Sequence, residues 1–258
     1  GAIESCNGAY MWHLGLDVGS TTVKAVAMRT NGELLFTSYR RHLSEIGVAV
    51  SEILAEFASK LGTGEITISI TGSAGLGVSN VLGIPCCQEV IASSKAVESL
   101  IPETDVAIEL GGEDAKIIYF SNGIEQRMNG MCAGGTGSFI DQMATLLKTD
   151  AVGLNEYAKN YKAIYPIAAR CGVFAKSDIQ PLINEGATKE DLSASIFQAV
   201  VNQTISGLAC GKPIRGNVAF LGGPLHFLTE LRNAFIRTLK LTEDQIIAPE
   251  HSHLFAAI

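Results

Sequence analysis

The sequence predicts an α/β protein with two lobes, and three observations support this prediction. The chain has 258 residues, of which 47% are hydrophobic and 17% are charged, so it can bury a large core and is longer than most single domains. Short β-branched strands alternate with segments of helical apolar spacing. One pattern, a strand that ends near an acidic residue, a glycine turn and a second strand, occurs twice. We expect an N-terminal extension at 1–12, either native or left from expression, a first lobe at 13–128 and a second lobe at 129–258.

The first lobe is predicted to begin with three antiparallel strands, at His13–Val18, Val23–Met28 and Glu33–Tyr39. Asn31-Gly32, between the last two, is the strongest short-range hairpin signal. Residues 17–22, between the first two, form what we call the first acidic turn.

The first acidic turn suits a phosphate, because it offers backbone N–H groups and hydroxyls. Asp17 is a candidate catalytic residue and a candidate Mg²⁺ ligand through water. An ordinary polar hairpin with an exposed Asp is the alternative. The candidate cofactor-binding residues of this hairpin are Gly19, Ser20, Thr21, Thr22 and Lys24.

Helices are predicted at Ser44–Leu61, which Gly62 ends, and at Ala92–Leu100. A strand at Glu65–Ile70 runs into a glycine-rich loop at 71–77. This loop either faces a ligand or only turns the chain, and we interpret it as a connection.

A buried strand at Asp105–Leu110 leads into residues 109–114, the second acidic turn. A carboxylate that ends an apolar strand is costly to bury unless a cation or donors meet it, so Glu109 is the second candidate catalytic residue. Two acidic turns facing each other would clamp the β- and γ-phosphates of a nucleotide and their metal. A surface acidic hairpin is the alternative. The candidate cofactor-binding residues here are Gly111, Gly112, Glu113, Asp114 and Lys116, and strands are expected at Ile117–Phe120 and Ile124–Met128.

The stretch 128–139 joins a cysteine to a glycine-rich turn and a helix expected at Thr136–Leu147. Cys132 is a soft metal ligand once deprotonated. Cys171 repeats its placement, beside a glycine and just before a helix. We therefore predict that nucleotide binding and an iron–sulfur centre meet here. The turn residues that would approach a phosphate at the helix start are Gly134, Gly135, Thr136 and Gly137.

A long helix is expected at Thr188–Cys210, with Thr188 and Asp191 as a capping box in which Asp replaces the usual Glu. A strand at Val218–Leu221 precedes the glycine pair Gly222-Gly223, which would let an adenosine lie flat on the backbone. A further helix is expected at Leu225–Lys240.

Net charge and apolar patterning indicate which partners and which location to expect. The formal charge of −7 argues against a nucleic-acid surface. We expect no secretory signal in residues 1–10 and no apolar stretch of about 18 residues that could span a membrane, so we expect a cytoplasmic protein. Leu254–Ile258 has the pattern of a first helical turn, and we expect the chain to be part of a longer protein.

The six cysteines show no CxxC pattern, so neither a disulfide framework nor a zinc ribbon is indicated. Any metal site would have to be assembled across distance. We interpret the cysteines other than Cys132 and Cys171 as core or incidental residues.

Three turns in this order, 17–22, 109–114 and 221–224, resemble the two phosphate motifs and the adenosine motif of the actin, Hsp70 and sugar-kinase superfamily. With Cys132 and Cys171, the resemblance narrows to the ATP-dependent activators of 2-hydroxyacyl-CoA dehydratases and benzoyl-CoA reductases, and most closely to the N-terminal domain of large activase-related proteins. It extends from about His13 to Ile258. The stretches that carry it are Leu16–Lys24, Gly111–Lys116, Cys132–Gly137 and Arg170–Ala175.

The resemblance implies a two-lobed, ribonuclease H-like fold with ATP or ADP and Mg²⁺ in the cleft. It also implies a homodimer that shares one [4Fe-4S] cluster held by Cys132 and Cys171 of each chain. Since a cubane cluster takes four thiolates and each chain offers two, a two-fold axis would complete the set. The implied output is a low-potential electron, taken from a ferredoxin- or flavodoxin-type donor and passed to a dehydratase- or reductase-type enzyme.

The chain departs from this family pattern at two positions. Many activators carry Asp where this chain has Glu109, and simple activators often carry Gln where it has Glu113. Two other functions stay open: a small-molecule kinase of the same superfamily, which needs a carboxylate base beside the substrate hydroxyl, and a non-redox ATP-gated assembly protein.

Overall fold

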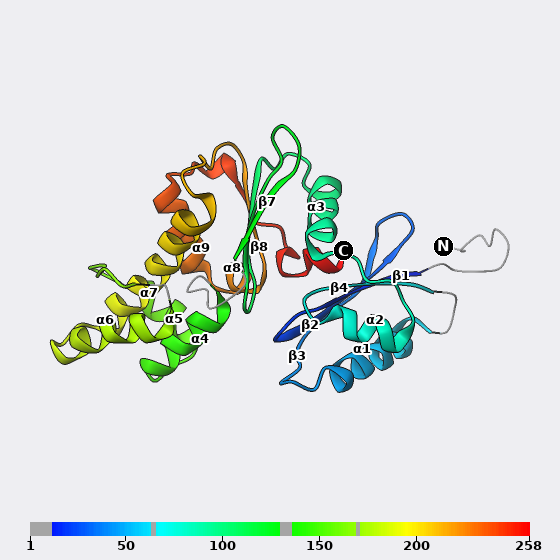
Figure 1. Ribbon diagram of the computed structural model, residues 1–258, viewed down its shortest axis with the longest axis horizontal. Coiled ribbons are helices and arrows are strands. Elements are labelled where there is room, and N and C mark those ends of the chain that lie inside the picture. Colours follow the sequence, from blue (N-terminus) through cyan, green and yellow to red (C-terminus); the bar gives the residue numbers. More distant parts are fainter. Residues whose placement is uncertain (1–11, 63–65, 130–135, 169–170) are drawn as a thin grey trace. The chain divides into compact units, whose positions relative to one another are not determined.

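The computed structural model describes residues 12–62, 66–129, 136–168 and 171–258. The chain divides into two compact units, the first formed by residues 1–100 with 254–258 and the second by 101–253 (Figure 1). This division differs from the boundary that we predicted after residue 128. Residues 106–129 hydrogen-bond into the same sheet as residues 218–221, because the backbone groups of buried strands must find partners.

The first unit is built on a four-stranded sheet in the order β3-β2-β1-β4. Its strands are β1 (Trp12–Val18), β2 (Thr22–Arg29), β3 (Leu34–Arg41) and β4 (Ile66–Thr71). The first three are antiparallel neighbours, as predicted, whereas β4 runs parallel to β1. Parallel strands end at the same edge of a sheet, so the segments that follow β1 and β4 lie beside each other.

The described part of the first unit contains the helices α1 (Ile46–Leu61), α2 (Gly75–Leu82) and α3 (Glu89–Leu100). Figure 1 shows α1 and α2 on the same face of the sheet. Phe57 of α1 packs edge-on against Phe36 of β3, with 6.0 Å between the ring centroids. The predictions of α1 and α3 are confirmed. Helix α2 was missed, because its first half coincides with the glycine-rich loop.

The second unit repeats this sheet order. Its five strands follow the order β7-β6-β5-β8-β9, in which β5, β6 and β7 are antiparallel neighbours and β8 runs parallel to β5. Every residue of β5 and β6 is buried, which explains their nearly continuous apolar sequences. The strands are β5 (Val106–Leu110), β6 (Ala115–Tyr119), β7 (Glu125–Asn129), β8 (Val218–Leu221) and β9 (Ile246–Ile247).

One hydrophobic core joins this sheet to the helices of the second unit. The helices are α4 (Gly137–Leu146), α5 (Ala151–Ala158), α6 (Gly172–Asn184), α7 (Lys189–Thr204), α8 (Gly223–Phe227) and α9 (Thr229–Leu239). A π-helical turn, η1 (Ile205–Ala209), continues α7, and the short 3-10 turns η2 (Glu243–Gln245) and η3 (Ser252–Ala257) lie near the end of the chain.

The helix expected at Leu225–Lys240 is divided in two. Leu228, between α8 and α9, has φ −104° and ψ 87°, outside the helical region. Its side chain is buried in the core of the second unit. Helical spacing continues through this point in the sequence, so the break was not visible there.

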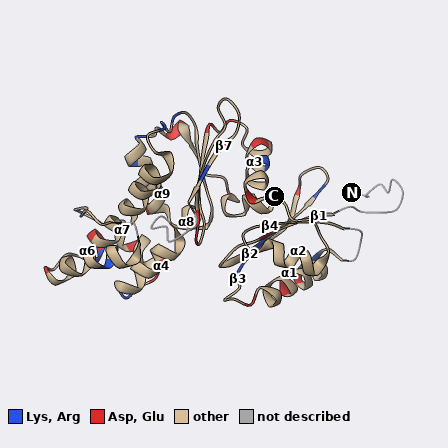
Figure 2. Cartoon of the chain, in the orientation of Figure 1, with Lys and Arg blue, Asp and Glu red and all other residues tan. Residues whose placement is uncertain are grey.

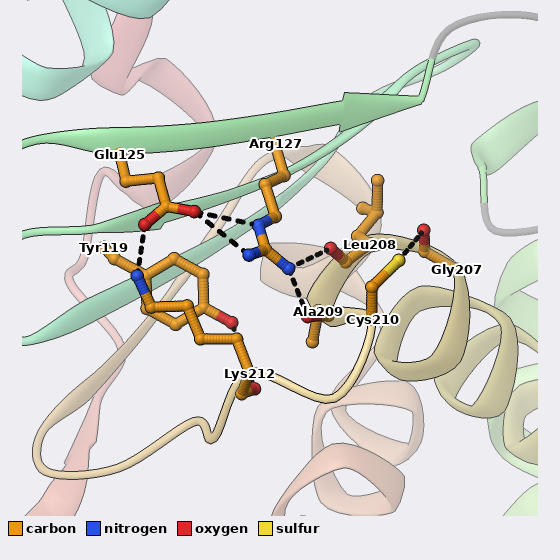
Figure 3. Close-up of polar contacts among 8 residues, drawn as sticks. All are labelled: Tyr119, Glu125, Arg127, Gly207, Leu208, Ala209, Cys210 and Lys212. Atoms are coloured by element: carbon orange, nitrogen blue, oxygen red, sulfur yellow. Dashed lines mark hydrogen bonds and ion pairs between the residues drawn. The ribbon is translucent and has the colours of Figure 1, made fainter.

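Charged side chains fasten strand β7 to the end of the long helix (Figure 3). The guanidinium of Arg127 donates to the carbonyl oxygens of Leu208, at 3.3 Å, and Ala209. A cation at this position complements the negative end of the helix dipole. Lys212 and Arg127 both contact Glu125, and they lower the pKa of its carboxyl group. The strand that leads toward Cys132 is thereby tied to η1.

The start of α7 anchors the extended segment that precedes α6. Asp191 accepts the backbone N–H groups of Lys162 and Ala163 at 2.7 and 3.0 Å, and these bonds lower the pKa of its carboxyl group. The Thr188 hydroxyl caps the helix by accepting from the Asp191 N–H at 3.2 Å. The predicted capping box is therefore correct for Thr188 and wrong for the Asp191 side chain, which the tertiary fold uses to hold a loop.

We expect Asp191→Asn to lower the thermal unfolding midpoint at pH 7 and to lose this effect in acid. Since folding lowers the pKa of Asp191, its stabilisation is complete above about pH 5 and declines as the pH falls through the usual Asp value near 3.9 toward the folded value. Unfolding midpoints of both chains between pH 7 and 3 check this. Asp150→Asn, which exchanges one good helix cap for another, is the control. A constant difference across the pH range would contradict the prediction.

Candidate functional site

The two acidic turns share one construction. In β1 and β2, Asp17 lies directly across the ladder from Lys24, and Nζ is 3.3 Å from Oδ2. In β5 and β6, Glu109 lies directly across from Lys116, with Nζ 3.5 Å from Oε1. Both carboxylates are nearly buried, and each lysine offsets a charge that would otherwise be costly to bury.

The backbone closes both turns in the same way. The N–H of Gly19 donates to the Thr22 carbonyl at 2.8 Å, and the N–H of Gly111 donates to the Asp114 carbonyl at 2.9 Å. This leaves the N–H groups of the two central residues of each turn without a backbone acceptor among the described residues. Such neighbouring donors form an anion-binding concavity. The central residues are Ser20 and Thr21 in the first acidic turn and Gly112 and Glu113 in the second.

The glycine that directly follows the neighbouring parallel strand packs against each of these strand ends. Gly222, with φ +93°, approaches so closely that a Cβ atom would lie 2.0 Å from the carbonyl oxygen of Leu110. Gly72, with φ +99°, repeats this contact in the first unit, where a Cβ atom would lie 2.4 Å from the carbonyl oxygen of Val18 and 2.5 Å from Oδ1 of Asp17. Only glycine meets both requirements, the positive φ and the missing side chain.

Helix α4 begins against the second acidic turn. The N–H of Gly137 donates to the Gly111 carbonyl at 2.9 Å, and the N–H of Ser138 donates to the Gly112 carbonyl at 2.7 Å. A Cβ atom on Gly137 would lie 3.4 Å from Cγ of Pro224. The second acidic turn, the start of α4 and the segment after β8 therefore meet at one edge of the second sheet. Cys132, Gly134 and Gly135 lie outside the described residues.

Cys171 is the N-cap of α6, with extended backbone at φ −159° and ψ 165°. The helix begins at the very next residue, which agrees with the predicted placement of this cysteine just before a helix. Helices α4 and α6 pack together, and a Cβ atom on Gly172 would lie 2.2 Å from Oε1 of Gln142 in α4. The first N–H groups of α6, the positive end of its dipole, lie directly after this cysteine.

Other features of the described residues restrict the site. No group of three or more His, Cys, Asp or Glu side chains there could hold a metal ion. None of the helices in these residues is both long enough and apolar enough to cross a membrane. Figure 2 shows acidic and basic residues on both units.

Sequence reasoning missed three features of this site. The lysines Lys24 and Lys116 were assigned to the cofactor, but each is paired with the carboxylate of its own hairpin. Gly72 was assigned to a connecting loop. The signal in the sequence that could have identified its role is a glycine directly after a strand, as at Gly222. His42 was not considered, and it contacts the first acidic turn through its ring.

Comparison with known proteins gives consistent matches over most of the chain. A model of the BadF/BadG/BcrA/BcrD ATPase family matches residues 14–252. The chain is 31% identical over 217 residues to a 2-hydroxyisocaproyl-CoA dehydratase activator of Clostridioides difficile, covering 83% of this chain and 81% of the relative. It is 30% identical over 221 residues to a (R)-2-hydroxyglutaryl-CoA dehydratase activating ATPase of Acidaminococcus fermentans, covering 83% of each protein.

Solved structures agree. The activator of the 2-hydroxyisocaproyl-CoA dehydratase from Clostridium difficile with bound ADPNP matches with a TM-score of 0.81 and 26% identity, covering 96% of this chain and 91% of that chain. The fold is the two-sheet α/β fold shared with actin-like proteins and sugar kinases. This confirms the fold class that the sequence predicted.

We expect Gly222→Ala to destabilise the chain far more than Gly123→Ala. Both glycines have φ +93°, but only Gly222 has an atom in the way of a Cβ. The backbone strain should cost about 1–2 kcal/mol in either variant, and the overlap with Leu110 should raise the cost to at least about 3 kcal/mol at Gly222. Urea unfolding measures both. Equal losses would show that the close approach to Leu110 relaxes without cost.

Proposed function

Because the chain belongs to the BadF/BadG/BcrA/BcrD ATPase family, we propose that it hydrolyses Mg-ATP to deliver a low-potential electron to a partner of the 2-hydroxyacyl-CoA dehydratase type. The observation that carries the nucleotide part is the shared construction of the two acidic turns. The relatives named as dehydratase activators support the partner class.

The nucleotide would bind through backbone donors. The N–H groups of Ser20, Thr21, Gly112 and Glu113 would meet phosphate oxygens, and the glycine pair Gly222-Gly223 would lie beneath the adenosine. These amides need no reorganisation, because the hydrogen bonds that close each turn already fix their directions.

The two carboxylates would act on water and metal. Asp17 would hold Mg²⁺ through water, and Glu109 would orient the attacking water. Lys24 and Lys116 would hold both carboxylates in place, since each lysine lies beside one of them at the sheet edge. A general base or water-orienting residue of this kind contributes roughly 10²–10⁴-fold to a rate.

Cys171 and Cys132 would supply the cluster ligands. Cys171 fits this role because its thiol stands at the start of α6, where the helix dipole stabilises an anion. A [4Fe-4S] cluster stores and releases one electron, and it takes four thiolates. With two cysteines per chain, a homodimer about a two-fold axis would complete the set. We further propose a ferredoxin- or flavodoxin-type donor and a cytoplasmic location.

Contacts in the second unit offer a route between the nucleotide and the cluster. The start of α4 is hydrogen-bonded to the second acidic turn, and α4 in turn fills the space above Gly172, one residue from Cys171. If the second acidic turn moved on hydrolysis, α4 and α6 would move with it, because closely packed side chains transmit a displacement from one element to the next. This supports coupling of hydrolysis to the cluster environment.

We expect Asp17→Asn to lower the rate of Mg-ATP hydrolysis at least about 100-fold while leaving iron content unchanged. The amide keeps the size of the side chain but neither holds Mg²⁺ through water nor balances the charge of Lys24. Phosphate release and iron analysis on the anaerobically purified protein measure the two quantities. Asp150→Asn serves as the control. Unchanged hydrolysis in Asp17→Asn would remove this residue from the site.

We expect Cys171→Ala to lose the cluster and the dimer it bridges while keeping ADP affinity. The anaerobic wild-type protein should hold about two Fe per chain, which corresponds to one four-iron cluster per dimer, with broad absorption near 400 nm. Cys210→Ala, at an exposed cysteine outside the proposed cluster, should retain both signals. An iron-loaded Cys171→Ala dimer would contradict the assignment, and an iron-free wild-type protein would remove electron delivery altogether.

A further inference from the structure

His42 lies just after β3 and is almost completely buried, with 6% of its surface exposed. All four of its hydrogen-bonding groups are used. Its backbone N–H donates to the Thr21 carbonyl at 3.1 Å, and its carbonyl accepts from the Glu45 N–H at 2.6 Å. Its ring Nε2 lies 2.9 Å from the Gly19 carbonyl oxygen, and its Nδ1 lies 3.1 Å from the Ser44 backbone nitrogen.

These partners determine the protonation of the ring. A carbonyl oxygen can only accept, so Nε2 must donate to Gly19. A backbone N–H can only donate, so Nδ1 must accept from Ser44. The ring is therefore the neutral Nε2–H tautomer. Neither the other tautomer nor the imidazolium can make both bonds.

The connection that follows His42 is strained. Leu43 and Ser44 have φ values of 46° and 70°, both in the left-handed region. Two consecutive residues other than glycine in this region are unfavourable, and surrounding contacts must hold them there. The hydrogen bond from Ser44 to the His42 ring is one such contact. The strained connection thus fixes the ring in the orientation that reaches Gly19.

The contact with Gly19 sets the direction of a donor in the first acidic turn. In a planar trans peptide the C=O and N–H groups point in opposite directions. Because His42 holds the Gly19 carbonyl, it also directs the N–H of Ser20 away from the ring. The bond from the His42 N–H to Thr21 fixes a second peptide group of the same turn.

The second unit holds the corresponding carbonyl by other means. Gly111 occupies the place of Gly19, and its carbonyl oxygen accepts from the Gly137 N–H at 2.9 Å. In both units, the segment after the third strand supplies this donor: a side chain in the first and a backbone amide in the second. That one carbonyl is held in both units indicates that its direction matters to the turn.

We propose that His42 is a positioning residue of the nucleotide site, which acts by orienting the Gly19–Ser20 peptide toward a bound phosphate. This rests on the proposed function, because it takes the first acidic turn as a phosphate site. His42 would act through the turn and not through a contact of its own with the nucleotide. In the first acidic turn, the His42 ring has the role that the Gly137 N–H has in the second acidic turn.

Two isosteric variants separate this role from a general contribution to stability. In His42→Gln the side-chain amide nitrogen takes the place of Nε2 and can still donate to Gly19. In His42→Asn the side-chain oxygen takes the place of Nδ1 and can still accept from Ser44. Each variant loses one hydrogen bond, so we expect their thermal midpoints to fall by similar amounts.

We expect Mg-ADP to bind His42→Asn about tenfold more weakly than wild type, and His42→Gln within about threefold of wild type, as the loss of one such bond would give. Titration calorimetry on the full chain measures both. Leu43→Gly, which changes the same connection without touching the bond to Gly19, should bind within about twofold of wild type.

Equal affinities in the Asn and Gln variants would overturn the role of His42 while leaving the proposed function intact. A wild-type chain that binds no Mg-ADP would instead overturn the proposed function. A third measurement needs no nucleotide: the ¹⁵N shifts of the wild-type His42 ring should report the Nε2–H tautomer at pH 7. A protonated Nδ1 would overturn the inference by itself.

Discussion

The close approach of a glycine to a neighbouring strand end is the constraint on which the rest of this structure depends. Gly72 and Gly222 each occupy a position where a side chain would overlap a backbone carbonyl. Because both glycines come directly after the parallel strand beside an acidic hairpin, each brings a second turn to the same edge of its sheet. Each acidic turn is therefore packed against a second turn of its own unit, and its two central amides have no backbone acceptor among the described residues.

Charge balance at these edges is local. Asp17 and Glu109 are nearly buried, and burying a lone carboxylate would be unfavourable. Each meets a lysine directly across the ladder, so the pair forms when the hairpin forms and needs no distant partner. A buried pair of this kind is weak support for stability in itself, but breaking it is costly. The arrangement therefore holds each carboxylate beside a cation of its own hairpin at the edge of the sheet.

The second unit differs from the first in the segment after its third strand. In the first unit that segment is a strained connection that presents His42 to the turn. In the second it leads through residues 130–135 into α4, whose first amides bind the turn directly. The segment after the third strand thus holds the turn through a side chain in the first unit and through the start of a helix in the second. In the second unit the helix that holds the turn also packs on α6, the helix that begins directly after Cys171.

Much of the fold was predictable from the sequence alone. Alternating β-branched residues, Asn31-Gly32 and the repeated acidic hairpins predicted the strands and both acidic turns, because strand period and turn chemistry are local properties. Tertiary structure decided the rest. The partner of Asp191, the break at Leu228, the role of Gly72 and the ring contact of His42 all involve residues distant in sequence. Local patterns record which conformations a segment prefers, but they do not record which distant backbone group will come within reach of a side chain once the sheets have formed.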